Sequence, residues 1–128
     1  MGRVRSALTD RALAPRQGDE GAPSAEIVFE PEFASAAADL RTGMTVLVLT
    51  WLHEADREAL VVHPRCLRER PPTGVFATRS PDRPNPIGLH PVRITAVSEC
   101  SITVDGLEAI DGTPVLDVKP TLGPIDAR

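Results

Sequence analysis

The chain has 128 residues, a length that suits one compact domain with an ordinary hydrophobic core. Only 3% of the residues are aromatic and none is tyrosine, which disfavours a protein that binds single-stranded nucleic acid by base stacking. The net charge of −4 argues against bulk electrostatic binding of nucleic acid, and two isolated cysteines indicate neither a zinc site nor a disulfide framework.

The N-terminal residues 1–26 predict a short strand around Arg3–Ser6 followed by an irregular arm, because prolines and glycines interrupt any sustained period. Residues 1–128 are expected to form a single domain with no additional C-terminal domain. No apolar run is long enough to span a bilayer and no signal peptide precedes the domain, so a cytoplasmic protein without a membrane partner is expected.

The next segments predict a strand at Ile27–Glu30 and one short helix. The helix is expected to begin at Pro31 and to end at Thr42–Gly43, with apolar residues at helical spacing between them. Met44–His53 is the strongest strand of the chain. Its β-branched and aromatic residues are apolar on both faces, which predicts a central strand.

Further strands are predicted by short β-prone runs, each bounded by Pro, Gly, Asp or Ser, at Leu60–His63, Gly74–Thr78, Val92–Val97, Ile102–Val104 and Pro114–Val118. Short strands at regular intervals favour a mainly β fold, a small barrel with one or two short helices. No Gly-rich loop opens a helix after a strand, so the doubly wound nucleotide-binding fold has no support.

Residues 78–89 form the most unusual stretch, in which three prolines alternate with Arg, Asn and Gly. Each proline fixes its own φ angle and restrains the residue before it, so Arg79, Arg83 and Asn85 should project from a stiff backbone. A guanidinium fork suits a carboxylate or phosphate, and residues 65–93 hold six arginines against two acidic residues. Two alternatives stay open: the arginines are merely solvated, or Arg83 is held by Asp82 or Asp111.

Residues 107–120 form the second unusual stretch. Asp111-Gly112 is a turn signal, and Thr113–Val118 reads as a strand. Alternate residues of a strand point the same way, so Asp117 and Lys119 are expected on one face. As an exposed ion pair they would contribute well under about 1 kcal/mol, and Asp111 would be only a turn residue.

These two stretches together carry a resemblance to a known family. Residues 74–89 (GVFATRSPDRPNPIGL) followed by residues 111–120 (DGTPVLDVKP) closely resemble the TsaA-like family of S-adenosylmethionine-dependent methyltransferases. Weaker similarities lie at Val4–Ser6, Pro15–Gln17 and Trp51–His53. The chain departs from the family at His90, where serine is common, and at Thr121, where an aromatic residue is common.

The resemblance implies a small β-barrel that forms a homodimer and binds S-adenosyl-L-methionine near the dimer interface, with no metal. The cofactor site implied by position comprises Arg79, Ser80, Pro81, Arg83, Asn85, Pro86, Ile87, Gly88, Asp111, Thr113 and Pro114. The opening arm, through Arg5, Ser6 and Gln17, is implied to contact the substrate or to close over the cofactor.

The resemblance also implies a methyl acceptor, N6 of threonylcarbamoyladenosine beside the anticodon of tRNA. Asp117, Lys119 and His53 are the candidate catalytic residues, with Asp111 and His90 as further titratable groups. Two other hypotheses stay open: a methyltransferase for a small molecule, and a module that binds an adenosine cofactor without turnover.

Overall fold

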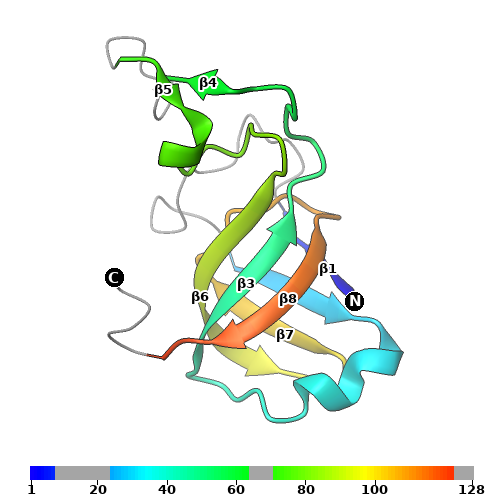
Figure 1. The fold of residues 1–128 in the computed structure, drawn as a ribbon. Helices are drawn as coiled ribbons and strands as arrows, with labels where there is room; N and C mark the ends of the chain where they lie inside the picture. Colours follow the sequence, from blue (N-terminus) through cyan, green and yellow to red (C-terminus); the bar gives the residue numbers. More distant parts are fainter. Residues whose placement is uncertain (8–23, 64–70, 123–128) are drawn as a thin grey trace.

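The computed structural model describes residues 1–7, 24–63 and 71–122. Within these residues six strands close into an antiparallel barrel, in the spatial order β1-β2-β7-β6-β3-β8 (Figure 1). The barrel strands are β1 Gly2–Arg5, β2 Ala25–Phe29, β3 Thr45–Trp51, β6 Ile87–Val97, β7 Ser101–Asp105 and β8 Pro114–Pro120. The prediction of a mainly β barrel is confirmed.

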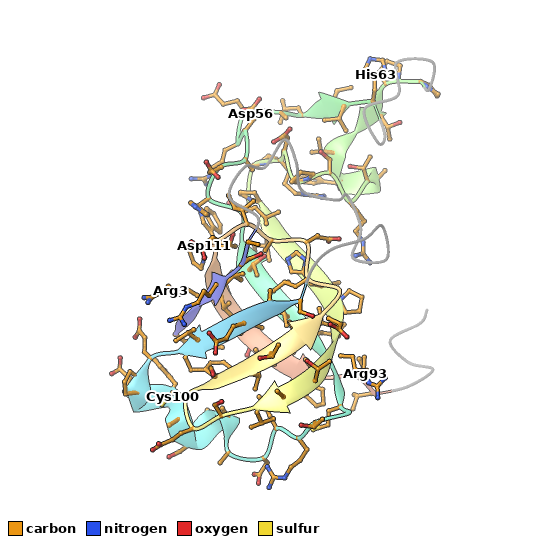
Figure 2. All side chains as sticks on the ribbon, turned by 180° about the vertical axis from the view of Figure 1, so that it is seen from behind. Arg3, Asp56, His63, Arg93, Cys100 and Asp111 are labelled. Carbon is orange, nitrogen blue, oxygen red and sulfur yellow. The ribbon has the colours of Figure 1, made fainter. Side chains whose placement is uncertain are left out.

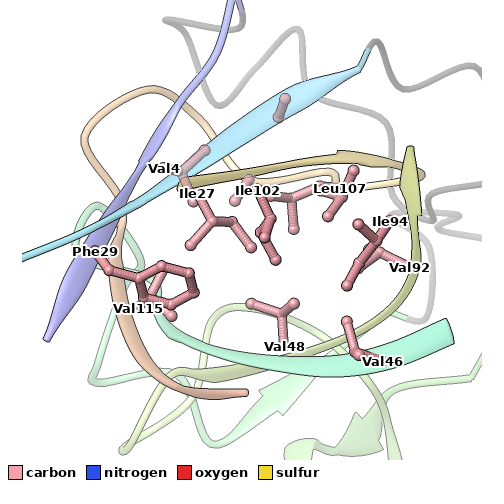
Figure 3. Close-up of a cluster of buried hydrophobic side chains, with 13 residues drawn as sticks. Val4, Ile27, Phe29, Val46, Val48, Val92, Ile94, Ile102, Leu107 and Val115 are labelled. Carbon is pink, nitrogen blue, oxygen red and sulfur yellow. The ribbon is translucent and has the colours of Figure 1, made fainter. Parts of the chain in front are cut away.

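The hydrophobic core fills the inside of the barrel, where aliphatic side chains from all six strands meet (Figure 3). Burial alternates along the strands, as it does at Ala25, Ile27 and Phe29 of β2, because successive side chains of a strand point to opposite faces. Val, Ile and Leu dominate this interior. A barrel of six strands can therefore be filled without many aromatic side chains.

Strand β3 is central, as predicted, because it pairs with β6 along one edge and with β8 along the other. Val46, Val48 and Thr50 point into the barrel, whereas Leu47 and Leu49 lie half-buried on the outer face. Apolar residues on the outer face of β3 are therefore not part of the core.

The short helix begins at Pro31 as expected, but it is a 3-10 helix, η3 (Pro31–Ala37), and it ends before Thr42–Gly43. None of its residues is buried, although Ala37 and the following Leu40 pack against the core. Because only Ala37 and Leu40 contact the core, the segment gains too little burial to support a longer helix. Gly43 instead makes a tight turn into β3 with a positive φ of 95°.

A two-stranded extension projects beyond one end of the barrel (Figure 1). It contains β4 (Val61–Val62) and β5 (Thr73–Gly74), followed by a 3-10 turn, η5 (Val75–Ala77). The strand expected at Gly74–Thr78 is therefore wrong beyond Gly74. Thr78 donates both its backbone N–H and its hydroxyl to the carbonyl of Val75, and these bonds curl the chain out of the extended conformation.

Strand β6 begins at Ile87 rather than at Val92, because Pro91 does not interrupt it. The neighbouring strand β7 pairs with β6 only from Arg93 onward, so Pro91 lies where β6 has no strand on that side and needs no N–H there. Strand β8 pairs with β3 through a register shift, so that Val115 and Val118 both pack toward the core although they lie three residues apart.

Candidate functional site

The Pro-rich loop, residues 78–86, joins the extension to the start of β6 at the upper rim, the barrel end from which the extension projects (Figure 1). Arg83 sets the shape of this loop. Its guanidinium donates hydrogen bonds to the carbonyl oxygens of Val75 (2.8 Å), Thr78 (2.9 Å) and Ser80 (3.0 Å). In addition, the hydroxyl of Ser80 accepts the N–H of Asp82. The loop is held from within, which supports the prediction of a stiff, preorganised segment.

Arg83 therefore points at the backbone of its own loop and not outward as a free fork. Of the two carboxylates that were alternative partners, Asp82 accepts the N–H of Asp56 at 2.9 Å and Asp111 accepts the N–H of Ser6 at 3.0 Å. Sequence reasoning expected Arg83 to project from the loop, whereas the structure turns it onto carbonyl oxygens three to eight residues away, and such acceptors leave no sequence signal.

Sequence reasoning missed Arg57, which lies in the turn between β3 and β4. Its Nε donates to the carbonyl of Pro84 at 2.9 Å and its Nη2 to Oδ1 of Asn85 at 3.3 Å. The same guanidinium lies 5.1 Å from the centroid of the Trp51 ring, within cation–π range. Arg57 thus fixes the Asn85 amide against the end of β3. No motif in its own segment points to this role.

The loop between β7 and β8 meets the end of β1 at the upper rim. Gly112 has a positive φ of 84° and donates its N–H to the carbonyl of Val4. Thr113 is buried, and its hydroxyl donates a hydrogen bond of 2.7 Å to the carbonyl of Ile110. With the bond from Ser6 to Asp111, these contacts tie the loop to β1. Figure 2 shows Asp111 at this end of the barrel.

The substrate-contact residues expected in the opening segment fall in different places. Ser6 lies at the upper rim, whereas Arg5 is exposed and forms an ion pair of 3.1 Å with Glu26 of the neighbouring strand. Gln17 lies outside the described residues. Pro114, expected at the cofactor site, begins β8 beside β1 and is half-buried.

Asp117 and Lys119 point to the same face of β8, as predicted, and form an ion pair of 2.8 Å. They lie on the outer wall of the barrel, opposite Leu49 and Leu47 of β3. The hydrogen bond from Lys119 lowers the pKa of Asp117, burial opposes this effect, and the N–H of Val118 with the charge of Lys119 lowers the pKa further. The carboxylate is therefore ionised at neutral pH.

The remaining predicted site residues divide between surface and interior. Pro86 and Gly88 are buried, and the missing side chain of Gly88 faces Thr50 and His90 inside the barrel. The exposed residues are Arg79, Pro81, Ile87 and His53, and Ser80 is half-buried.

The structure thus gathers the Pro-rich loop, Arg57, Ser6 and the β7–β8 loop at the upper rim, and leaves Asp117 and Lys119 on the adjacent outer wall. The described part of the chain has two hollows: one between η3 and β8, which Asp117 helps to line, and one beside Phe76 on the extension. The described residues contain no cluster suited to a metal ion. None of the helices that the structure describes is long and apolar enough to cross a membrane.

Comparison with protein families gives one match over nearly the whole chain. The model of the tRNA-methyltransferase O N-terminal domain matches residues 3–127. A relative from Methanothermobacter thermautotrophicus, named a probable S-adenosyl-L-methionine-binding protein, is 42% identical over 127 residues, which cover 99% of this chain and 90% of the relative.

Longer proteins contain the same domain. A probable S-adenosyl-L-methionine-binding protein of Archaeoglobus fulgidus is 44% identical over 128 residues, covering 99% of this chain and 34% of that protein. The crystal structure of TrmO from Pseudomonas aeruginosa matches with a TM-score of 0.76 and 32% identity, over 99% of this chain and 56% of TrmO. The chain thus spans about a third of the Archaeoglobus fulgidus protein and about half of TrmO.

Proposed function

The chain belongs to the family of the tRNA-methyltransferase O N-terminal domain, and we propose that it binds S-adenosylmethionine and transfers its methyl group to a nitrogen atom. Relatives that share 42% and 44% of their residues with this chain are named S-adenosyl-L-methionine-binding proteins. The cofactor also suits the site, because a methyl group on a sulfonium needs only alignment with its acceptor and no metal.

The observation that carries the proposal is the self-bonded Pro-rich loop. Arg83 and Arg57 make five hydrogen bonds to residues of this loop and its flanks, so most of its conformational freedom is lost before a ligand arrives. Arg79 is exposed beside it. A loop fixed in this way lowers the entropy lost on binding and leaves its backbone and the Asn85 amide to recognise a polar ligand.

The catalytic residues of this proposal lie on the outer wall. Transfer from S-adenosylmethionine is an in-line displacement, after which the acceptor nitrogen must lose a proton. Asp117 is ionised, and Lys119 holds it at 2.8 Å. An ionised carboxylate can accept that proton. His53 and Asp111, exposed near the upper rim, are the other candidates for this task.

The acceptor that we propose is N6 of threonylcarbamoyladenosine in tRNA, with the reaction taking place in the cytoplasm. The support is the family, whose name refers to a tRNA methyltransferase. The net charge of −4 favours the second candidate, a small-molecule acceptor, because phosphate contacts dominate binding to nucleic acid.

Two measurements test the proposal in turn. Titration calorimetry should detect S-adenosylmethionine binding at micromolar concentration, and the absence of heat and of a thermal shift at millimolar cofactor would refute cofactor binding. Mass spectrometry of tRNA nucleosides from cells that lack the protein then identifies the acceptor. Loss of the N6-methylated nucleoside supports tRNA, and an unchanged nucleoside profile rejects it.

We further propose that the chain forms a homodimer through the outer face of β3, β6 and β8. Apolar side chains gather on this face: Ile87 is 48% exposed, Leu89 39% and Leu116 45%, and they flank the half-buried Leu49. A contiguous apolar surface of this kind is typical of an interface. Because Asp117 and Lys119 border it, a two-fold partner would enclose the outer wall and convert an open surface into a site.

A further inference from the structure

Three polar side chains form a hydrogen-bonded chain inside the barrel. His90 of β6 is 3% exposed, its Nε2 lies 2.7 Å from Oγ1 of the fully buried Thr50, and its Nδ1 lies 3.2 Å from Oε1 of Glu108. Thr50 belongs to β3 and Glu108 to the β7–β8 loop. The chain therefore connects three segments that are distant in sequence.

The protons of this chain follow from its chemistry. A carboxylate in its ionised form only accepts hydrogen bonds, so the contact with Glu108 fits a ring that carries its proton on Nδ1 and accepts the hydroxyl proton of Thr50 at Nε2. The order of groups matches that of a hydroxyl nucleophile, but Thr50 has no exposed surface and no substrate can reach it. These three side chains therefore stabilise the fold and do not attack a substrate.

Gly88 makes room for this chain. A Cβ at Gly88 would lie against Oγ1 of Thr50 and 2.5 Å from Nε2 of His90, closer than any non-bonded contact. The glycine of the Pro-Ile-Gly segment is thus required by the interior of the barrel. The requirement for glycine at position 88 is therefore independent of any ligand bound outside the barrel.

Glu108 couples the chain to the upper rim. Its side chain is 22% exposed, yet its Oε2 is buried and has no hydrogen-bond partner among the described residues. The bond from His90 is the interaction that compensates this carboxylate. A buried carboxylate that loses its donor must turn toward water, and because Glu108 lies in the β7–β8 loop, the loop would move with it.

We propose that His90 is a positioning residue which, with Thr50 and Glu108, clamps the β7–β8 loop to β3 and β6. The clamped loop carries Asp111 and Thr113, and β6 continues directly from the Pro-rich loop. The clamp therefore fixes the distance between the β7–β8 loop and the Pro-rich loop at the upper rim. Its effect on cofactor binding rests on the proposed function, whereas its effect on the loop does not.

The test compares Thr50→Val, which keeps the shape of the side chain but removes the hydroxyl, with Thr50→Ser, which keeps the hydroxyl. Thr45→Val, on an exposed position of the same strand, is the matched control. Amide exchange is measured at Gly112 and Thr113, both of which donate backbone hydrogen bonds. The affinity for S-adenosylmethionine is measured at a temperature where every variant is folded.

We expect Thr50→Val to speed exchange at Gly112 and Thr113 about tenfold and to weaken cofactor binding about fivefold, because it leaves a buried ring nitrogen without its donor. Thr50→Ser and Thr45→Val should stay within about twofold of the native chain. If Thr50→Val does not fold, Glu108→Ala, which removes the partner on the loop, is measured in its place with the same expectation.

Two results would overturn the inference. Unchanged amide exchange in Thr50→Val would show that the hydrogen bonds among Thr50, His90 and Glu108 do not hold the β7–β8 loop. Faster exchange with native cofactor affinity would show that this loop does not position the site. A native chain that binds no S-adenosylmethionine refutes the proposed function, and the exchange data alone then decide whether the clamp exists.

Discussion

Replacing Arg83 with alanine should weaken cofactor binding without any loss of a direct contact to the cofactor. The guanidinium donates to three carbonyl oxygens at 2.8–3.0 Å, and hydrogen bonds from a charged donor contribute about 1.5–3 kcal/mol each when buried. The side chain is only half-buried, and alanine regains about 2 kcal/mol of side-chain entropy, so we expect a net loss of about 2 kcal/mol. If the loop must be ordered to bind, this is about a 30-fold loss of affinity.

Titration calorimetry with S-adenosylmethionine measures this loss, and Arg93→Ala is the matched control because Arg93 is an exposed arginine of the adjoining strand. Amide exchange of residues 75–83 without cofactor separates loop order from direct contact. A pinning role predicts faster exchange in Arg83→Ala. Two results would refute this role of Arg83 in ordering the loop: an affinity of Arg83→Ala equal to that of Arg93→Ala, or a lower affinity with unchanged amide exchange.

Three further predictions concern the interior, the outer wall and assembly. Gly88→Ala should destabilise the chain by about 1–3 kcal/mol through overpacking, whereas in a Thr50→Ala/His90→Ser background, where the clashing atoms are gone, adding Gly88→Ala should lower the melting temperature little further; an equal loss in both backgrounds would mean that Thr50 and His90 are not the reason for the glycine. Asp117→Asn should lower stability to urea at pH 7 by well under about 1 kcal/mol, because the side chain is 43% exposed and solvent screens the pair. Since the folded pKa is lowered, the stabilisation is present above the ordinary value of 3.8 and disappears as pH falls through the folded value, so the variant and the native chain should converge in acid. Leu89→Glu should sediment as a monomer, whereas Val97→Glu, on the same strand but beyond the proposed interface, should not; a native chain that is monomeric at micromolar concentration would exclude the dimer.

The strands were predictable because their signal is local. Met44–His53 was assigned as a central strand on its β-branched residues, and the structure places β3 at Thr45–Trp51 between two partners. The errors arose where one local signal was misleading. Pro91 led us to begin the strand at Val92 and so to miss the first half of β6. Gly74–Thr78 has the composition of a strand, but hydrogen bonds from Thr78 to Val75 curl it into a turn.

The site was less predictable because its contacts join distant residues. Thr50 and His90 are separated by 40 positions and Arg57 and Asn85 by 28, and no periodicity within either segment encodes such a pair. From the sequence, His90 was only one further titratable group. Only the closing of the barrel brings it against Thr50 and Glu108, which is why its departure from the family pattern gave no indication of a role.

The internal use of Arg83 changes what the upper rim can offer an anionic group. A guanidinium with three carbonyl partners has little capacity left for a carboxylate of the ligand. The nearby cations on the described surface are Arg79, Arg57, Arg5 and Lys119. Arg57 is bound to Pro84 and Asn85, Arg5 is paired with Glu26 and Lys119 with Asp117, and no side-chain partner is described for Arg79. Recognition of the cofactor should therefore depend on backbone groups of the Pro-rich loop and on Arg79.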